Sequence, residues 1–273
     1  MSRHRPSRTG EAGAGQPGAV FSRLYVLTGS HFCELARWAL DARGVAVKTV
    51  ALSPGPHIMY LRRQLPPLRS SQLPVWHTDS ALLQGSDQIL THLGYPVEQA
   101  AAEAVLNGQI GPLARQAFYA ALCSNPGLAK AWMQAAYTTG PGWLAAVVQR
   151  APCWATSALL RREGRRSGDL PQLLHGLAMA CESLSTVATA ELTALAAATR
   201  PVLSRVALMA GALLGPVLVP APAPWQQAPW SSAALAALVD LQRLPLLQLA
   251  RAAWGVRQAR QAAGRAPGPG ELG

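Results

Sequence analysis

The signals for β-strands in this sequence end at Pro96, and this break constrains the fold more than any other feature. Before Pro96, short apolar runs rich in strand-forming residues stand on either side of helical stretches. After Pro96, every segment with a clear apolar period favours helix. The expected fold class is therefore α/β plus all-α, with a mixed first domain followed by a helical second one.

The first part of the chain opens with a β-α-β pattern. Residues 24–27 form a short apolar run that ends at a Thr-Gly-Ser turn. Residues 31–43 place apolar side chains on one helical face, and Gly44 supplies the expected stop. Residues 45–52 alternate as a strand does. Because such a crossover joins parallel strands, we expect 24–27 and 45–52 to pair in parallel.

A hairpin and a short helix complete this part. Residues 53–71 give no clean period and predict an irregular segment with one short helix near 59–63. Residues 73–77 and 81–84 flank an Asp-Ser turn, which is typical of a hairpin. A helix is expected over 88–93, with Ser86 as its candidate N-cap.

The part of the sequence after Pro96 predicts helices at 101–122, 127–138, 143–149, 170–198, 206–218 and 232–261, with 170–198 as one amphipathic helix.

Residues 206–239 carry no charge and raise the question of a membrane span. Their continuous apolar run stops at Val219 and is followed by prolines, whereas a span needs about 20 residues. We therefore expect a central core helix and no membrane span.

Net charge and cysteine content narrow the classes of function and partner that this chain could have. The formal net charge is +11, but nearly all basic residues are scattered Arg, and the cluster at 161–166 predicts a solvated loop. No nucleic-acid-binding motif accompanies the charge, so we expect no nucleic-acid partner. Four widely spaced Cys predict reduced thiols and no metal site. The basic N-terminus lacks an apolar segment, which favours a cytoplasmic location. Residues 1–20 and 262–273 are expected to be disordered tails.

Several short segments together resemble the glutathione transferase family. They are Ser30-His31-Phe32-Cys33 after the first strand, Gln72-Leu73-Pro74-Val75, Ser86-Asp87-Gln88-Ile89-Leu90, Leu203-Ser204-Arg205, and the closing stretch 245–260. The Ser-x-x-Cys form is similar to that of theta-like bacterial members. This resemblance covers about residues 22–260. It implies a thioredoxin-like glutathione-binding domain at 21–95 and an all-helical domain at 100–261.

The resemblance also implies a function, which is conjugation of the glutathione thiol to an apolar electrophile by a homodimer that needs no metal. Ser30 would be the catalytic residue, because its hydroxyl can stabilise the thiolate of bound glutathione. The other implied glutathione-binding residues are Leu73 and Pro74 for the cysteinyl part, Pro74 through a cis bond, Ser86 for the γ-glutamyl carboxylate, Asp87 for the ammonium group and Gln72 for the glycyl end.

Two alternatives stay open at this point. Cys33 is a candidate redox residue, and a mixed disulfide there would make the chain a glutathione-dependent thiol oxidoreductase. A non-catalytic binding or scaffold protein is favoured by Gly85 where family members often have Glu or Gln, by Leu68-Arg69 in place of Asn-Pro, and by the basic surface. Ala207 in place of a capping Asp is a third departure from the family pattern and weakens the support for the fold. Ser30 could also be no more than a helix N-cap.

Overall fold

The structure is a computed structural model that describes residues 22–53, 57–68, 70–124, 126–137, 169–199, 201–220 and 230–265. The expected tail at 1–20, the helix at 143–149 and the Arg-rich loop at 161–166 lie outside these ranges.

A four-stranded sheet in the order β2-β1-β3-β4 forms the centre of the N-terminal domain. Its strands are β1 (Ser22–Leu27), β2 (Lys48–Leu52), β3 (Val75–Thr78) and β4 (Leu82–Gln84). Strands β1 and β2 pair in parallel, and β3 is antiparallel to both β1 and β4. The predicted parallel pair and the predicted hairpin are therefore confirmed. Strand β2 begins later than expected, because Val45 N–H closes the preceding helix by donating to the carbonyl of Leu40 (3.0 Å).

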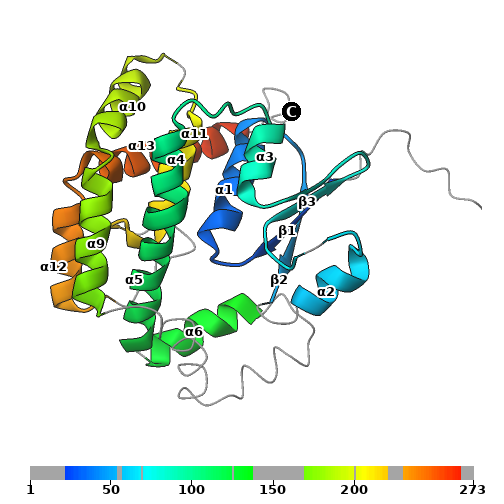
Figure 1. The fold of residues 1–273 in the computed structure, drawn as a ribbon, viewed down its shortest axis with the longest axis horizontal. Coiled ribbons are helices and arrows are strands. Elements are labelled where there is room, and N and C mark those ends of the chain that lie inside the picture. The colour runs from blue at the N-terminus through cyan, green and yellow to red at the C-terminus, as the bar shows by residue number, and fades with distance from the viewer. Residues whose placement is uncertain are drawn as a thin grey trace, which may run out of the picture.

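Helices cover both faces of this sheet (Figure 1). Helices α1 (His31–Ala42) and α3 (Ser86–His92) pack on one face, against Leu24 and Val26 of β1. Helix α2 (His57–Gln64) packs on the other face, against Tyr25. This arrangement confirms the thioredoxin-like expectation. The predicted N-cap of α3 is wrong by one residue, because Gly85 occupies that position with φ 90° and Ser86 is the first helical residue.

The second domain is helical in all its described elements. They are α4 (Ala100–Val105), a π-helical turn η1 (Leu106–Ile110), α5 (Gly111–Ser124), α6 (Pro126–Tyr137), α9 (Leu170–Glu182), α10 (Ser185–Ala197), α11 (Arg205–Leu214), a 3-10 turn η2 (Gly215–Val217), α12 (Ser232–Leu241) and α13 (Pro245–Arg265).

Two segments predicted as single helices are broken in the structure. The stretch 170–198 divides into α9 and α10, where the Ser183 hydroxyl donates to the carbonyl of Ala180 (2.7 Å) and competes with helix continuation. The stretch 232–261 divides before Pro245, which has no N–H to continue a helix. Helix α13 also runs through Arg265, into the segment expected as a disordered tail.

Helix α11 is the core helix that the uncharged segment predicted, since all ten of its residues are buried. Among the described helices, none combines the length and apolar character that a membrane crossing needs. At Gly211 a Cβ atom would lie 2.6 Å from Cζ3 of Trp38, so only glycine lets α1 approach this closely. Trp254 donates its indole N–H to the carbonyl of Gly211 (2.8 Å) and meets Trp38 edge to face.

Helix α1 is therefore held on two sides. One face carries Cys33, Ala36 and Leu40 into the core under the sheet. The opposite face carries Leu35 and Trp38 into the core of the helical domain. A helix buried on both sides offers a rigid support for the residue at its start, Ser30.

Candidate functional site

Most of the predicted site residues meet at one end of the sheet. Ser30 follows the carboxyl end of β1, and the antiparallel register of Tyr25 with Val75 brings the start of β3 to that same end. The bond between Leu73 and Pro74 is cis, as predicted. The carbonyl of Pro74 accepts from the N–H of Gly85 (2.8 Å), so Ser86 follows directly beside it. Residues far apart in the sequence thus line one edge.

Ser30 stands at the N-cap position of α1 but does not cap the helix with its side chain. Its backbone is extended (φ −79°, ψ 116°), and its hydroxyl makes no capping hydrogen bond. Its carbonyl accepts from the N–H of Glu34 (2.9 Å), which begins the helix. The hydroxyl instead bonds with the thiol of Cys33. A half-buried hydroxyl that is not needed by the helix remains able to serve a ligand.

Cys33 is enclosed beneath Ser30. Its side chain is only 1% exposed, and its sulfur accepts from the N–H of Leu27 (3.4 Å). Burial raises the pKa of the Cys33 thiol to about 11, although the hydrogen bonds from Ser30 and Leu27 oppose that rise. Because the thiolate is the reactive form, both the burial and the raised pKa weigh against a nucleophilic role.

His31 is buried beside Ser30 and is 2% exposed. Its ring lies 4.5 Å from that of Phe32, and its Nε2 atom has no hydrogen-bond partner among the described residues. Burial, followed by the positive charge of Arg115, lowers the pKa of His31 to about 3. The imidazole is therefore neutral in the folded protein at neutral and mildly acidic pH.

This burial predicts a loss of stability in acid. Below the ordinary pKa of 6.5 the unfolded chain binds a proton at His31, while the folded chain does so only near pH 3. Stability therefore falls as the pH drops through this window, by about 2 kcal/mol between pH 6.5 and 5. Urea unfolding of His31→Leu should lack this component. His175→Leu, which changes an exposed histidine of α9, should keep it.

The loop before β3 is held by a residue that the sequence did not single out. Gln84 of β4 donates from Nε2 to the carbonyls of Ser70 and Gln72, both at 2.9 Å. The N–H of Gln72 in turn bonds to the Ser70 hydroxyl (3.1 Å). Gln72 itself is exposed. These contacts fix the backbone of Gln72 rather than its side chain, and they orient the chain where it enters Leu73.

Ser86 and Asp87 begin α3, and the structure gives them different surroundings. Ser86 is 7% exposed. The Asp87 carboxylate is exposed, yet its Oδ1 atom accepts from Arg205 Nη2 (3.0 Å) and from Asn107 Nδ2 (3.4 Å). The π-helical turn η1 carries Asn107 to this position. Asp87 thus joins the two domains in addition to its predicted place in the glutathione site.

Arg205 is the centre of that junction and was not predicted. Its side chain is 5% exposed and forms an ion pair with Glu103 (2.8 Å) as well as with Asp87. It also donates to the hydroxyl of Thr91 (3.0 Å) and to the carbonyl of Tyr95 (3.1 Å). Burial raises the pKa of Glu103, and the guanidinium of Arg205 opposes that rise.

Ala207 stands where the family has a capping Asp, and Glu191 partly takes the place of that acid. Ser204 caps α11 by accepting from the N–H of Ala207 (3.0 Å), as the resemblance implied. The Ser204 hydroxyl donates to Glu191 of α10 (2.7 Å), and Gln99 donates to the same carboxylate (3.3 Å). An acid from another helix therefore anchors this cap.

An aromatic cluster of the helical domain reaches the site beside Ser30. Gly29 has φ 77°, and a Cβ atom there would lie 2.8 Å from Cζ2 of Trp132. Trp132 packs edge to face with Phe118 (5.9 Å) and Tyr119 (6.0 Å). An apolar wall from α5 and α6 thus adjoins the residue before Ser30.

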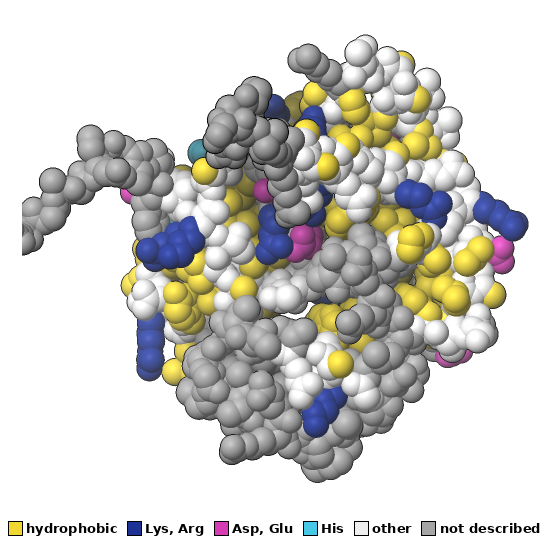
Figure 2. Space-filling model, turned by 180° about the vertical axis from the view of Figure 1, so that it is seen from behind, with side chains coloured by type: hydrophobic (Ala, Val, Ile, Leu, Met, Phe, Trp, Pro, Cys, Tyr) yellow, Lys and Arg dark blue, Asp and Glu magenta, His cyan; other side chains and the backbone are white. Residues whose placement is uncertain are grey.

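The basic side chains and the possible metal ligands are spread out in the described part of the chain. Figure 2 shows the Lys and Arg side chains of one face lying apart from one another, in keeping with their scattered positions in the sequence. Within the described ranges, no three His, Cys, Asp or Glu side chains gather as they would around a metal ion.

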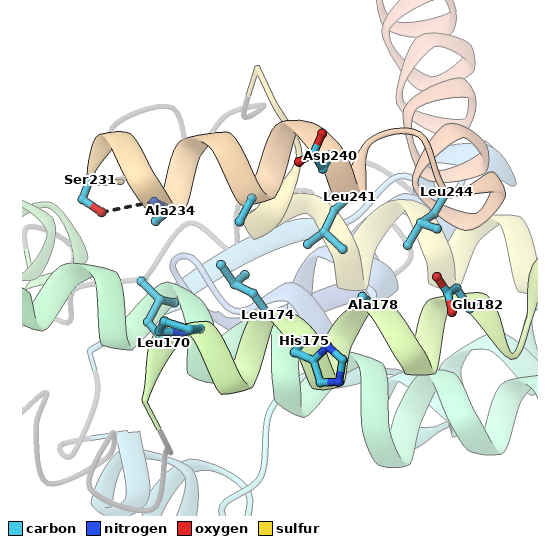
Figure 3. Close-up of a pocket in the computed structure, with 12 residues that line it drawn as sticks. Leu170, Leu174, His175, Ala178, Glu182, Ser231, Ala234, Asp240, Leu241 and Leu244 are labelled. Atoms are coloured by element: carbon cyan, nitrogen blue, oxygen red, sulfur yellow. Dashed lines mark hydrogen bonds between the residues drawn. The ribbon is translucent and has the colours of Figure 1, made fainter.

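A cavity of about 580 Å³ lies between α9 and α12, away from the sheet edge that holds Ser30. Figure 3 shows leucine side chains of the two helices pointing towards one another across it, among them Leu174 and Leu241. None of the predicted glutathione-binding residues lines this cavity.

Comparison with known proteins relates the N-terminal part of the chain to a family. Residues 24–99 match the family described as the N-terminal domain of glutathione S-transferase. No protein in a curated sequence collection matches the chain. The glutathione transferase GSTFuA3 of Phanerochaete chrysosporium is 12% identical in sequence, with a TM-score of 0.53 over 86% of this chain and 97% of that one, which shows a shared fold.

Glutaredoxin 2 of Salmonella typhimurium, solved in complex with glutathione, is 14% identical, with a TM-score of 0.43 over 85% of this chain and 98% of that one. The sequence match over residues 24–99 coincides with the thioredoxin-like sheet and its helices, and the fold continues into an all-helical domain. Residues 24–99 thus resemble the N-terminal domain of glutathione S-transferases in sequence, and the whole chain shares its fold with a glutathione transferase.

Proposed function

We propose that this protein is a glutathione transferase that conjugates the glutathione thiol to an apolar electrophile. The observation that carries the proposal is the meeting of Ser30, Leu73, cis-Pro74 and Ser86 at one end of the sheet, within the segment that matches the family. The Ser30 hydroxyl would donate to the glutathione sulfur and favour its thiolate, which attacks the electrophile.

The remaining contacts follow from the same arrangement. The backbone of Leu73 would pair with the cysteinyl part of glutathione, the Ser86 hydroxyl would bind the γ-glutamyl carboxylate, and Gln72 would lie near the glycyl end. The oxygen of Asp87 that is not bonded to Arg205 would receive the ammonium group. A homodimer is part of this proposal and rests on the resemblance alone. A cytoplasmic location is also proposed, and the four widely spaced Cys support it.

The electrophile would pack against the aromatic cluster of Phe118, Tyr119 and Trp132. This cluster meets Gly29 next to Ser30, and it comes from the helical domain. Small-molecule sites are commonly apolar and often lie between domains. The reacting carbon would then approach a sulfur atom placed at Ser30.

Titration of the purified protein with glutathione, followed by calorimetry, tests the proposal. We expect saturable binding in the micromolar-to-millimolar range. Ser86→Ala should weaken it about tenfold or more, because a hydrogen bond to a charged group is worth roughly 1.5–3 kcal/mol. Ser80→Ala, in the exposed turn between β3 and β4, is the matched control and should bind as the unaltered protein does.

Two results would count against the proposal in different ways. Absence of binding up to about 10 mM, equivalent to less than roughly 3 kcal/mol, would contradict a glutathione-dependent enzyme and favour a scaffold role. Binding that Ser86→Ala leaves unchanged would show that the peptide sits elsewhere.

A further inference from the structure

A positive charge lies on the helix that forms the apolar wall beside Ser30. Arg115 is an exposed residue of α5, and among the described residues it has neither an ion pair nor a hydrogen bond through its side chain. The same helix carries Phe118 and Tyr119, which belong to the aromatic cluster of the proposed electrophile site. The guanidinium of Arg115 is therefore available to a ligand that reaches this wall.

The geometry of α5 directs Arg115 towards the start of α1. Residues three and four positions apart share a helical face, so Gly111, Arg115 and Phe118 lie on one side of α5. That side packs on α1, since a Cβ atom at Gly111 would lie 3.3 Å from Cζ of Phe32. Long helical side chains lean towards the N-terminus of their helix, which takes the Arg115 side chain towards Gly111 and Phe32.

The aromatic cluster bounds Arg115 on its other side. One turn after Arg115, Phe118 packs edge to face on Trp132, with 5.9 Å between the ring centres. Trp132 in turn reaches Gly29, where a Cβ atom would lie 2.8 Å from its Cζ2 atom. Because Ser30 directly follows Gly29, the guanidinium and the aromatic rings border one surface beside the proposed catalytic hydroxyl.

The charges at the start of α1 leave Arg115 without a counter-charge. Burial, followed by the positive charge of Arg115, lowers the pKa of His31 to about 3, so the imidazole adds no second cation at neutral pH. The first carboxylate of α1 is Glu34, which is already paired with Arg37 (3.0 Å) and Arg257 (3.5 Å). A surface with one unbalanced positive charge favours a ligand that carries an anionic group.

We propose that the electrophile of this enzyme is an aromatic ring that carries a carboxylate, with the ring against the aromatic cluster and the carboxylate paired with Arg115. This inference rests on the proposed function, in which glutathione binds beside Ser30. The thiol proton passes to water, and the sulfur then forms a bond to the ring carbon that bears the leaving group. The bond to chloride breaks, and chloride leaves with the electron pair. Pairing at Arg115 orients the ring for this attack, which favours the anionic electrophile over a neutral one.

Conjugation of a matched pair of electrophiles tests the proposal. They are the anionic 4-chloro-3,5-dinitrobenzoate and the neutral 4-chloro-3,5-dinitrobenzamide, and glutathione displaces chloride from both. Each kcat/KM is divided by the rate constant of the uncatalysed reaction with glutathione, which corrects for the different reactivities of the two compounds. We expect the corrected value to favour the benzoate by about five- to tenfold, and this preference to fall as salt rises.

Variants locate the preference. Arg115→Gln should lower the corrected kcat/KM for the benzoate by about five- to tenfold, and that for the benzamide by no more than about twofold. Arg115→Lys keeps the charge and should retain part of the preference. Arg243→Gln changes an exposed arginine between α12 and α13 and should alter neither rate. Calorimetry with 3,5-dinitrobenzoate, which has no chloride to lose, should show the same weakening in Arg115→Gln without any reaction.

The outcomes distinguish this inference from the proposed function. Conjugation of both compounds without a preference for the benzoate, or with equal losses in Arg115→Gln, would overturn the inference and leave the transferase activity in place. Conjugation of neither compound would contradict the proposed function. In that case, 3,5-dinitrobenzoate binding that Arg115→Gln weakens would still support an anion site at Arg115, whereas unchanged binding, or none, would overturn it.

Discussion

Replacing Arg205 by methionine should lower the free energy of unfolding by about 3–5 kcal/mol, the largest stability effect we expect from one substitution here. The change leaves the Glu103 carboxylate, 7% exposed, without the guanidinium that neutralises it. It also removes the hydrogen bonds to Thr91 and to the carbonyl of Tyr95. Methionine is similar in size, so the loss reports the unpaired charge rather than a cavity.

A double-mutant cycle in urea separates the charge from the packing. Glu103→Gln removes the buried carboxylate, and the combined Arg205→Met, Glu103→Gln protein should recover much of the stability lost in Arg205→Met alone. Arg243→Met is the control, since it breaks an exposed ion pair with Asp240 (3.7 Å) and should cost less than about 1 kcal/mol.

The cycle can contradict this account in two ways. A loss below about 1 kcal/mol in Arg205→Met would show that water reaches Glu103 and screens it. A double variant no more stable than Arg205→Met would show that the neutral hydrogen bonds, not the ion pair, hold the junction. Arg205→Met should also bind glutathione more weakly than the unaltered protein if Arg205 fixes Asp87 in the proposed site.

The N-terminal domain could be predicted because its signals are local. Alternating strands, the Asp-Ser turn and the Gly44 stop each act over a few residues, and the structure confirms the parallel pair and the hairpin that they imply. The cis bond before Pro74 was expected from the resemblance and is present.

The junction between domains could not be predicted in the same way. Arg205 contacts Asp87 and Glu103, which are more than a hundred residues away in sequence and leave no local pattern around it. Gly211 looks like an ordinary glycine in an apolar run until Trp38 is packed against it. The break between α9 and α10 depends on a single hydroxyl that bonds to the carbonyl of Ala180, and such bonds compete with helices only in particular settings.

Ser30→Ala should reduce kcat/KM for conjugation of glutathione to a chloronitrobenzene by about ten- to a hundredfold. The estimate comes from the roughly 1.5–3 kcal/mol that a hydrogen bond to a charged acceptor contributes. The pKa of the bound glutathione thiol, read from the pH dependence of the rate, should rise by about one to two units in the variant. Because the Ser30 hydroxyl does not cap α1, the free energy of unfolding should stay within about 0.5 kcal/mol.

Cys33→Ala is the matched comparison and should retain conjugating activity. The Cys33 thiol is 1% exposed and its pKa is raised to about 11, so it contributes almost no thiolate at neutral pH. Removing it also frees the Ser30 hydroxyl from its present partner. Measuring the conjugation rate of Ser30→Ala and of Cys33→Ala therefore separates conjugation by a serine-stabilised thiolate from thiol oxidoreduction at Cys33.

The opposite pattern of activity losses would identify a glutathione-dependent thiol oxidoreductase. If Cys33→Ala abolished glutathione-dependent reduction of a mixed disulfide while Ser30→Ala kept it, the buried sulfur would have to become exposed during turnover, against the packing of α1 on the sheet. If Ser30→Ala instead lost about 1 kcal/mol of stability and no activity, the hydroxyl would be acting as a helix cap in solution. Only a rate loss in Ser30→Ala, with stability unchanged, assigns the thiolate to this hydroxyl.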